Sequence, residues 1–219
     1  VTPLIGAVLA HLATLEKALA EQSTPAPGVL GPVSEGGRER RALLRAYFSF
    51  LHALVQNSLT SVLCEAANLP LLKPSLERVV QGSVEGPDLT LQRQCFAILT
   101  GLVEHLGGAD DSFGSYVSGQ MLPASFSALA QPHFSLADAA AVPMLEAIVT
   151  LQRTMLAKLG PSFGAYLHDV YLPSISCPAR FCDEYVRLLG AGDVEALADF
   201  LKNNLAGAPA PATPQATTA

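Results

Sequence analysis

A block of residues that occurs twice in the chain constrains its fold more than any other sequence feature. Residues 88–123 and 138–173 match at a constant separation of 50 positions, so that Phe113-Gly114-Ser115-Tyr116 corresponds to Phe163-Gly164-Ala165-Tyr166. Three further matches have the same separation: Ala97–Thr100 with Ala147–Thr150, Leu106 with Leu156, and Met121–Ala124 with Tyr171–Ser174. Each copy contains a long segment with helical apolar spacing, a glycine break and a shorter segment that ends at Leu-Pro. The pattern predicts a helical hairpin repeated at a fixed period.

A fixed period of this kind is typical of a helical solenoid, in which each hairpin buries its apolar face against the next one. The 50-residue period is slightly longer than the roughly 40–47 residues of HEAT and armadillo units. The alternative is that two amphipathic helices resemble each other by chance in a chain rich in leucine and alanine. Because both prolines keep the same register and a glycine break occurs at nearly the same place in each copy, we favour the solenoid.

The composition of the 219-residue chain suits helices that bury one another. Hydrophobic residues make up 50% and charged residues 15%, which excludes a wholly disordered chain. The formal net charge of −6 argues against a free-standing basic module for nucleic acids. The first apolar run, Leu4–Leu12, is too short to span a bilayer. We therefore expect no insertion into a membrane.

The N-terminal part predicts two helices joined by a long loop. Val1 opens directly into a helical pattern, and we expect the sequence to be a fragment of a longer chain. Pro3–Ala20 has leucine and valine at helical spacing. Residues 21–37 contain three prolines and four glycines, which predicts a loop. A tolerated surface insertion is favoured over a functional lid for this loop.

Arg38–Asn57 predicts an amphipathic helix whose first turns are rich in arginine. Its apolar face is broad, and Arg38, Arg41 and Arg45 fall together on the opposite side at 100° per residue. Cations in a first helical turn oppose the helix dipole, so this arrangement hints at a use such as binding phosphates. The alternatives are a solvated face or arginines that pack on the neighbouring repeat. On charge alone, the candidate RNA-binding residues are Arg38, Arg40, Arg41 and Arg45.

The remainder of the chain predicts further helices and no strand. The expected helices are Ser58–Ala67, Leu71–Val84, Asp88–Leu106, Asp110–Leu122, Ala139–Leu159, Ser162–Tyr171, Ala179–Leu189 and Asp193–Leu205. Pro123 and Pro173 are expected to end helices, and Asp88 is placed to cap one. Residues 207–219 contain only five residue types and predict a disordered tail. The fold class is therefore all-α, with one HEAT-like region over residues 1–206.

The sequence contains no pattern typical of a catalytic or metal centre. Its five histidines are scattered, and no glycine-rich phosphate loop or nucleophile motif occurs. The four cysteines are best explained as reduced, mostly buried thiols, because Cys177 and Cys182 lack a second pair. We expect no catalytic residue, no metal and no cofactor. An enzyme built on a helical toroid is a remaining alternative, and it would require clustered polar residues in a pocket.

With the helices placed, several strings resemble the C-terminal region of the exportin-T family, the karyopherins that carry transfer RNA. They occur in the family's order, from about residue 45 to residue 201: Arg45–Phe50 with Gln56–Asn57, Val80–Val84 with Pro87–Asp88, Cys95–Phe96 with Ile98–Leu99, Leu102–Glu104 with Gly107–Gly108, Pro123–Phe126, Phe134–Ala139 and Tyr171–Ser174. Most of these residues pack helices, so the ordered set is more specific than any one string. The tail and the loop before Arg38 match no family pattern.

The resemblance implies a HEAT-repeat superhelix that binds mature tRNA together with Ran in its GTP form. It further implies passage through the nuclear pore by contact with pore proteins, shuttling between nucleus and cytoplasm, and release of tRNA when Ran hydrolyses GTP. A stacked-helix spring can contact RNA through backbone and shape, and two ligands that favour one curvature bind cooperatively. The alternative is a HEAT-type scaffold or another karyopherin with protein cargo.

Overall fold

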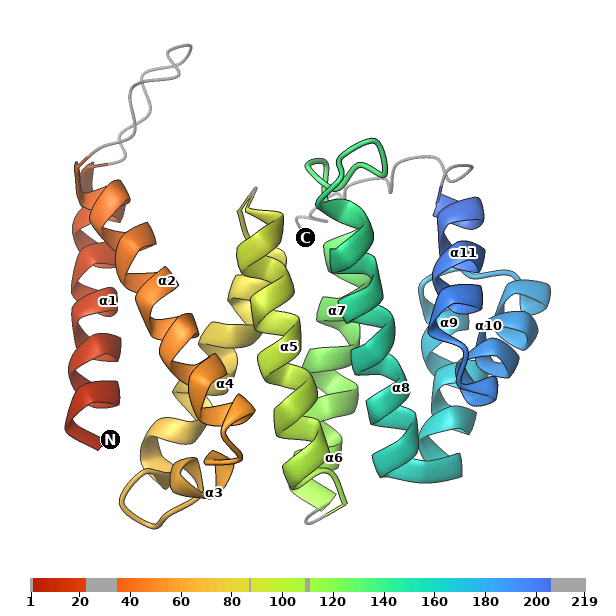
Figure 1. Ribbon diagram of the computed structural model, residues 1–219, viewed down its shortest axis with the longest axis horizontal. Coiled ribbons are helices and arrows are strands. Elements are labelled where there is room, and N and C mark those ends of the chain that lie inside the picture. The colour runs from red at the N-terminus through yellow and green to blue at the C-terminus, as the bar shows by residue number, and fades with distance from the viewer. Residues whose placement is uncertain (1, 23–34, 87, 109–110, 206–219) are drawn as a thin grey trace, which may run out of the picture.

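The computed structural model describes residues 2–22, 35–86, 88–108 and 111–205, and within these ranges the chain is helical and contains no strand. The helices stand side by side, as Figure 1 shows. Their bounds in chain order are α1 Thr2–Gln22, α2 Glu35–Gln56, α3 Thr60–Leu63, α4 Leu69–Val84, α5 Leu89–Leu106, α6 Asp111–Tyr116, η1 Val117–Met121, α7 Leu122–Leu129, α8 Ala141–Tyr166, η2 Leu167–Tyr171, α9 Leu172–Ser174, α10 Ala179–Ala191 and α11 Val194–Leu205. The predicted all-α solenoid of HEAT-like hairpins is confirmed.

The long helices α2, α5 and α8 lie next to one another in one layer, and α4 and α7 lie behind them (Figure 1). Helix α5 packs chiefly on α8, α2 and α4, so it forms the centre of the described fold. The core runs continuously through these contacts, and Phe48, Phe96, Ile98 and Met144 are fully buried within it. Burial of such side chains typically contributes about 1.5–3 kcal/mol each, which favours stacking of successive hairpins.

The segment predicted as a loop at residues 21–37 is shorter at both ends. Helix α1 continues to Gln22, and α2 already begins at Glu35 and includes Gly36 and Gly37. Residues 23–34 lie outside the described part of the chain. The predicted helix at Ser58–Ala67 is reduced to the single turn of α3. Leu69 and Pro70 begin α4, where the missing N–H of proline leaves no hydrogen bond unmade.

The predicted ends of α5 are confirmed. Asp88 accepts a hydrogen bond from the backbone N–H of Leu91 at 3.1 Å, which satisfies one of the unpaired donors of the first turn. Gly107 follows the last residue of α5, and Gly108 has a φ of 84°, which glycine adopts without steric cost. Gly160 also has a positive φ, with φ 73° and ψ −163°, and it forms a kink inside α8. The glycine break expected in each copy of the repeat is therefore present.

Pro123 does not end its helix, which corrects the sequence-based prediction, because α7 continues to Leu129, whereas the helix at Pro173 ends at Ser174. Each proline is preceded by a π-helical turn, η1 or η2, and these turns are also separated by 50 positions. The N–H of Leu122 donates to the carbonyl oxygen of Val117, five residues earlier, and Leu172 donates to Leu167. In a regular α-helix the proline ring would clash with the carbonyl four residues before it, and a wider turn provides room. The repeat therefore extends to a shared backbone irregularity.

Helices α2 and α5 pack closely because of Gly101. A β-carbon at this position would lie 2.0 Å from Cγ1 of Val55 on α2, far inside van der Waals contact. The absence of a side chain lets the two backbones approach, at the cost of a weaker intrinsic helix propensity. Close packing at this crossing fixes the position of α2, which carries the candidate RNA-binding arginines.

Buried hydrogen bonds join the three helices α7, α8 and α10. The side-chain amide of Gln152 on α8 donates to Oγ of Ser125 on α7 at 2.9 Å, and its carbonyl oxygen accepts from the hydroxyl of Tyr185 on α10. All three side chains are fully buried. Because a buried polar group without a partner is costly, these hydrogen bonds specify one relative position of the three helices.

The C-terminal end of the described fold is the hairpin of α10 and α11, as predicted. Gly192 joins the two helices with a φ of 83°. Both helices pack against α8, and α10 also contacts η2. The predicted disordered tail at residues 207–219 lies outside the described residues, and so does residue 206.

Candidate nucleic-acid interface

The four arginines selected on charge lie in the first half of α2 and divide into two groups. Arg38, Arg41 and Arg45 are exposed, as expected for a solvent-facing stripe, whereas Arg40 is half-buried. Arg38 and Arg41 form no hydrogen bond or ion pair with any part of the chain that the structure describes. Their positive charges are therefore available to an external anion.

Arg40 is held by a carboxylate from the preceding helix. Its Nε and Nη2 atoms donate to Oε1 of Glu16 on α1, at 3.0 and 2.8 Å. Glu16 also accepts from Arg78 on α4, whose Nη1 and Nη2 reach the two carboxylate oxygens at 2.6 and 3.0 Å. Burial favours a raised pKa for Glu16, but the hydrogen bonds from Arg78 and Arg40 outweigh it and lower the pKa below its ordinary value. Glu16 thus joins three helices as a carboxylate between two guanidinium groups.

Arg45 is paired with the cap of α5. Its Nη2 donates to Oδ2 of Asp88 at 2.7 Å, while Oδ1 of the same carboxylate caps the helix. Desolvation favours a raised pKa for Asp88, and the hydrogen bonds from Arg45 and from the backbone of Leu91 reverse it, so the pKa is lowered. With 62% of its side chain exposed, Arg45 can exchange this partner for another anion at little cost.

A groove of about 400 Å³ opens between α2, α4 and the start of α5, and we call it the arginine groove. Its charged lining residues are Arg40, Arg41, Arg45, Arg78, Glu85 and Asp88. Part of its floor is apolar, since Phe48 packs directly on the backbone of Gly82. Four guanidinium groups from two helices converge here, whereas the sequence indicated only those of α2.

Sequence reasoning missed Arg78 and Glu16 for an identifiable reason. Each stands beside a residue of opposite charge on its own helix, Lys17 or Glu77, so no run of like charge marks it. Their relation to Arg40 depends on how α1, α2 and α4 stack. No local pattern of residues reports that stacking, so the sequence carries no signal for this pair.

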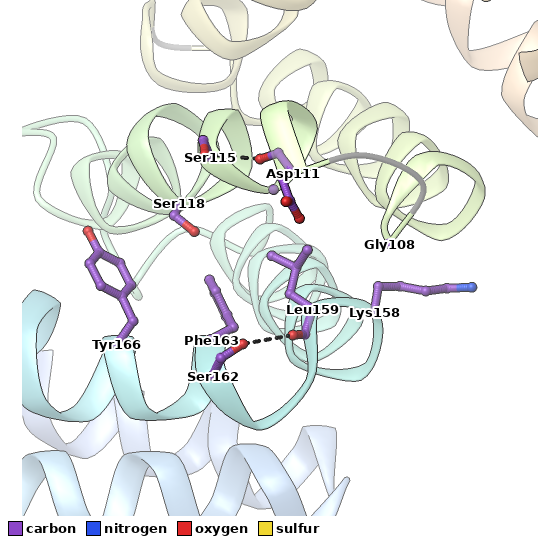
Figure 2. A pocket seen from close by; sticks show the side chains of 10 residues that line it. Gly108, Asp111, Ser115, Ser118, Lys158, Leu159, Ser162, Phe163 and Tyr166 are labelled. Carbon is purple, nitrogen blue, oxygen red and sulfur yellow. Dashed lines mark hydrogen bonds between the residues drawn. The ribbon is translucent and has the colours of Figure 1, made fainter.

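A larger cavity, about 730 Å³, lies elsewhere, between the two copies of the repeated block (Figure 2). Ser118 of η1 and Tyr166 of α8 face one another across it, and Asp111 and Lys158 lie toward the other end. Ser115 and Ser162 donate to backbone carbonyls of Asp111 and Leu159. No nucleophile with an adjacent base is present among these residues, so the cavity has the character of an inter-repeat groove.

A second groove has an equivalent wall one repeat earlier. Ser112, Phe113 and Tyr116 line a smaller, more apolar cavity of about 360 Å³, and Ser162, Phe163 and Tyr166 line the large one. These two sets are related by the same 50-residue separation. Burial raises the pKa of Tyr116 to about 12, with a contribution from Glu77, so its hydroxyl remains protonated. The repeated string therefore supplies an equivalent wall to two different grooves.

The cysteines and metal-ligand candidates give no reactive centre in the described ranges. All four cysteines are free; Cys95 and Cys182 are buried, and Cys64 and Cys177 are half-buried. Burial raises the pKa of each thiol, which disfavours the reactive thiolate. No group of three or more potential metal-ligating side chains occurs between residues 2 and 205 where the chain is described. Likewise, no described helix combines the length and apolar character that crossing a bilayer requires.

His168 forms an exposed ion-pair cluster on the C-terminal side of the fold. Its Nδ1 lies 2.6 Å from Asp169, and its Nε2 lies 2.8 Å from Asp183 on α10. Both ring nitrogens can donate only when the ring is protonated, and the hydrogen bonds to Asp169 and Asp183 raise the pKa of His168. The cluster joins η2 to α10.

We expect the contribution of this cluster to stability to depend on pH. A raised pKa in the folded state gives a stabilisation that is fully present below the unfolded pKa of about 6.5 and is lost as pH rises through the folded pKa. Thermal unfolding of the chain and of Asp183→Asn from pH 5.5 to 9 should show a difference in Tm that shrinks toward high pH. A difference in Tm that stays constant over this range would contradict the assignment. In a chain that already carries His168→Gln, adding Asp183→Asn should cause no pH-dependent change in Tm.

The stacked hairpins, the repeated grooves and the convergent arginines define a helical-repeat protein of the HEAT-like solenoid class. The sequence model of the Exportin-T family matches residues 38–208. The chain belongs to the exportin-T family, a group of karyopherin transport receptors.

Individual relatives agree with this assignment. Exportin-T of Homo sapiens is 34% identical over 168 residues, which cover 75% of this chain and 17% of that protein. Exportin-T of Danio rerio is 34% identical over 169 residues, with the same coverage, and that of Mycosarcoma maydis is 30% identical over 184 residues, or 80% of this chain and 16% of the relative. The chain thus spans about 17% of the length of these relatives. No solved structure matches it.

Proposed function

We propose that this chain is the C-terminal part of a tRNA nuclear export receptor, which binds mature tRNA cooperatively with Ran in its GTP form. The receptor carries tRNA through the nuclear pore by contact with pore proteins, shuttles between nucleus and cytoplasm, and releases its cargo when Ran hydrolyses GTP. The observation that carries this proposal is the match of residues 38–208 to the exportin-T family. In this proposal the chain works by binding and catalyses no reaction itself.

The surface of the chain supports binding to the sugar-phosphate backbone of RNA. The guanidinium groups of Arg38 and Arg41 have no partner among the described residues, and the arginine groove lies beside them. RNA with A-form geometry is recognised mainly by shape and by contacts to phosphates and 2′-hydroxyls, which requires no base-specific pocket. The net charge of −6 is compatible with this role if only a local surface contacts the RNA. The candidate contacts are Arg38, Arg40, Arg41 and Arg45.

The cooperative step has a direct test. Binding of labelled tRNA to the full-length receptor that contains this sequence is measured with and without GTP-loaded Ran. Two ligands that favour the same curvature of a helical spring tighten one another's binding by an equal factor. If GTP-loaded Ran leaves the tRNA affinity unchanged, the export mechanism is wrong for this protein, and a scaffold or a karyopherin with protein cargo becomes the better explanation.

We expect Arg38→Gln with Arg41→Gln to weaken tRNA binding by roughly 10–100-fold at low salt, since each charge-assisted contact to phosphate is lost. The slope of log affinity against log salt should fall in magnitude by about two, one for each phosphate contact. Fluorescence titration of tRNA at several KCl concentrations measures both quantities.

The matched control replaces two exposed arginines on α10, Arg180→Gln with Arg187→Gln, which removes the same charge from a distant helix. Equal losses in both double variants would indicate a general field effect rather than a local interface. An unchanged slope in the α2 variant would return Arg38 and Arg41 to a solvated face.

A further inference from the structure

The arginine groove contains more positive charge than its sequence suggests, and part of it is fixed in position. Arg40 and Arg78 have 26% and 18% of their side chains exposed, so neither moves freely in solvent. Glu16 holds both from α1. A side chain that is already ordered loses less conformational entropy when a ligand binds, which favours affinity at this position over a mobile surface arginine.

Glu16 does not use up the hydrogen-bonding capacity of the two arginines. A guanidinium group has five N–H bonds. Arg78 uses three, two to Glu16 and one to Gln81, which leaves two. Arg40 uses two, both to Glu16, which leaves three. Together, Arg40, Arg78 and Glu16 carry one net positive charge, and the two arginines keep five N–H donors beside the groove.

Arg41 and Arg45 complete the lining with mobile charge. Arg41 is exposed and has no partner among the described residues, and Arg45 shares Asp88 with the cap of α5. Two carboxylates, those of Glu85 and Asp88, also line the groove. Asp88 is compensated by Arg45, and Glu85 accepts a hydrogen bond from Gln81. With Glu16 included, four arginines and three carboxylates leave a single positive charge, which suits one monoanionic group better than a run of phosphates.

We propose that the arginine groove binds one phosphodiester group of the RNA, with Arg41 closing over a phosphate that Arg40 and Arg78 contact from the floor. This assignment rests on the proposed tRNA-binding function, and it adds α4 to an interface that the sequence placed on α2 alone. Arg78 is the residue that distinguishes the two interfaces. Guanidinium groups match the geometry of phosphate oxygens through two parallel N–H bonds, which a lysine cannot reproduce.

The experiment compares four forms of the 219-residue chain: the unchanged chain, Arg78→Gln, Arg78→Lys and Arg180→Gln. Binding of tRNA is titrated at several KCl concentrations. Arg78→Gln should weaken binding about tenfold and lower the salt slope by about one. Arg78→Lys should weaken binding several-fold but keep the slope, because the charge remains and the two-pronged geometry is lost. Arg180→Gln should change neither.

A second arm uses inorganic phosphate and does not require RNA. Titration with inorganic phosphate, followed by the Nε–H signals of arginine in NMR spectra, should shift Arg40, Arg41 and Arg78 and leave Arg180 and Arg187 unchanged. Thermal unfolding of each variant checks that the fold keeps its stability after the substitution, with Glu16 still bound to Arg40.

The outcomes separate this proposal from the proposed function. If tRNA binds but Arg78→Gln keeps both the affinity and the salt slope, the groove is not part of the interface and the export function stands. If tRNA does not bind, RNA binding by this chain fails, and the phosphate titration decides the groove: selective shifts of its arginines retain it as an anion site, and their absence overturns it.

Discussion

Replacing Phe48 with alanine is expected to lower the free energy of unfolding by about 3–5 kcal/mol, the usual range for loss of a buried phenylalanine. Phe48 is fully buried, and its ring packs against the backbone of Gly82, where a β-carbon would lie only 2.5 Å from Cζ. Helix α4 cannot move inward freely to fill the space, because Tyr47 of α2 also binds Ser75 of α4 at 2.8 Å. A cavity should therefore remain at the floor of the arginine groove.

Urea unfolding of the unchanged chain and of the variant measures this loss, provided that the slope m is the same for both. The matched control is Phe50→Ala on the same helix, because Phe50 is only half-buried and should cost clearly less. A loss for Phe48→Ala no larger than that for Phe50→Ala would show that the site collapses after truncation. Any accompanying fall in tRNA binding would then follow from the fold rather than from a lost contact.

Helix positions could be predicted from the sequence because apolar spacing reports directly on which face is buried. Leu44, Phe48, Leu51 and Val55 recur at helical spacing, and all are buried in α2. The cap at Asp88 and the breaks at Gly108 and Gly160 depend on local backbone geometry, so single residues were sufficient to indicate them.

The prolines were misread because their effect depends on what surrounds the turn. A proline normally ends an α-helix, but both prolines follow a π-helical turn, and at Pro123 the helix continues to Leu129, whereas at Pro173 it ends at Ser174. Met121 and Tyr171, which close the two turns, are both buried. Packing of the turn against the core therefore lets a proline follow it within the helix, and no local rule includes that contribution.

The sequence indicated the arginines of α2 but not the residues of other helices that contact them. A cluster of arginines in one helix is a local signal, and it located Arg38, Arg41 and Arg45 on an exposed face. Which of the arginines is free depends on carboxylates from other helices, such as Glu16 for Arg40. Helical spacing already placed Arg40 outside the stripe that holds Arg41, but only the stacked structure shows that Glu16 binds Arg40 and that Arg41 is unpaired in the described residues.

Replacing Gln152 with leucine is expected to cost about 2–4 kcal/mol, because a buried hydroxyl loses its acceptor and a second buried group loses a donor. Gln152 on α8 bonds to Ser125 on α7 and accepts from Tyr185 on α10. Burial raises the pKa of Tyr185, so its hydroxyl stays protonated and continues to demand an acceptor. Leucine supplies none, and water has no access to a fully buried site.

The double variant Gln152→Leu with Tyr185→Phe provides the decisive comparison. Removing both partners of a buried hydrogen bond is far less costly than removing one, so the double variant should be more stable than Gln152→Leu alone. Equilibrium unfolding of the four members of this cycle gives the coupling between the two positions. If Tyr185→Phe instead adds its own loss to that of Gln152→Leu, the hydrogen bond does not hold α10 to α8, and apolar packing alone must set the position of the last hairpin.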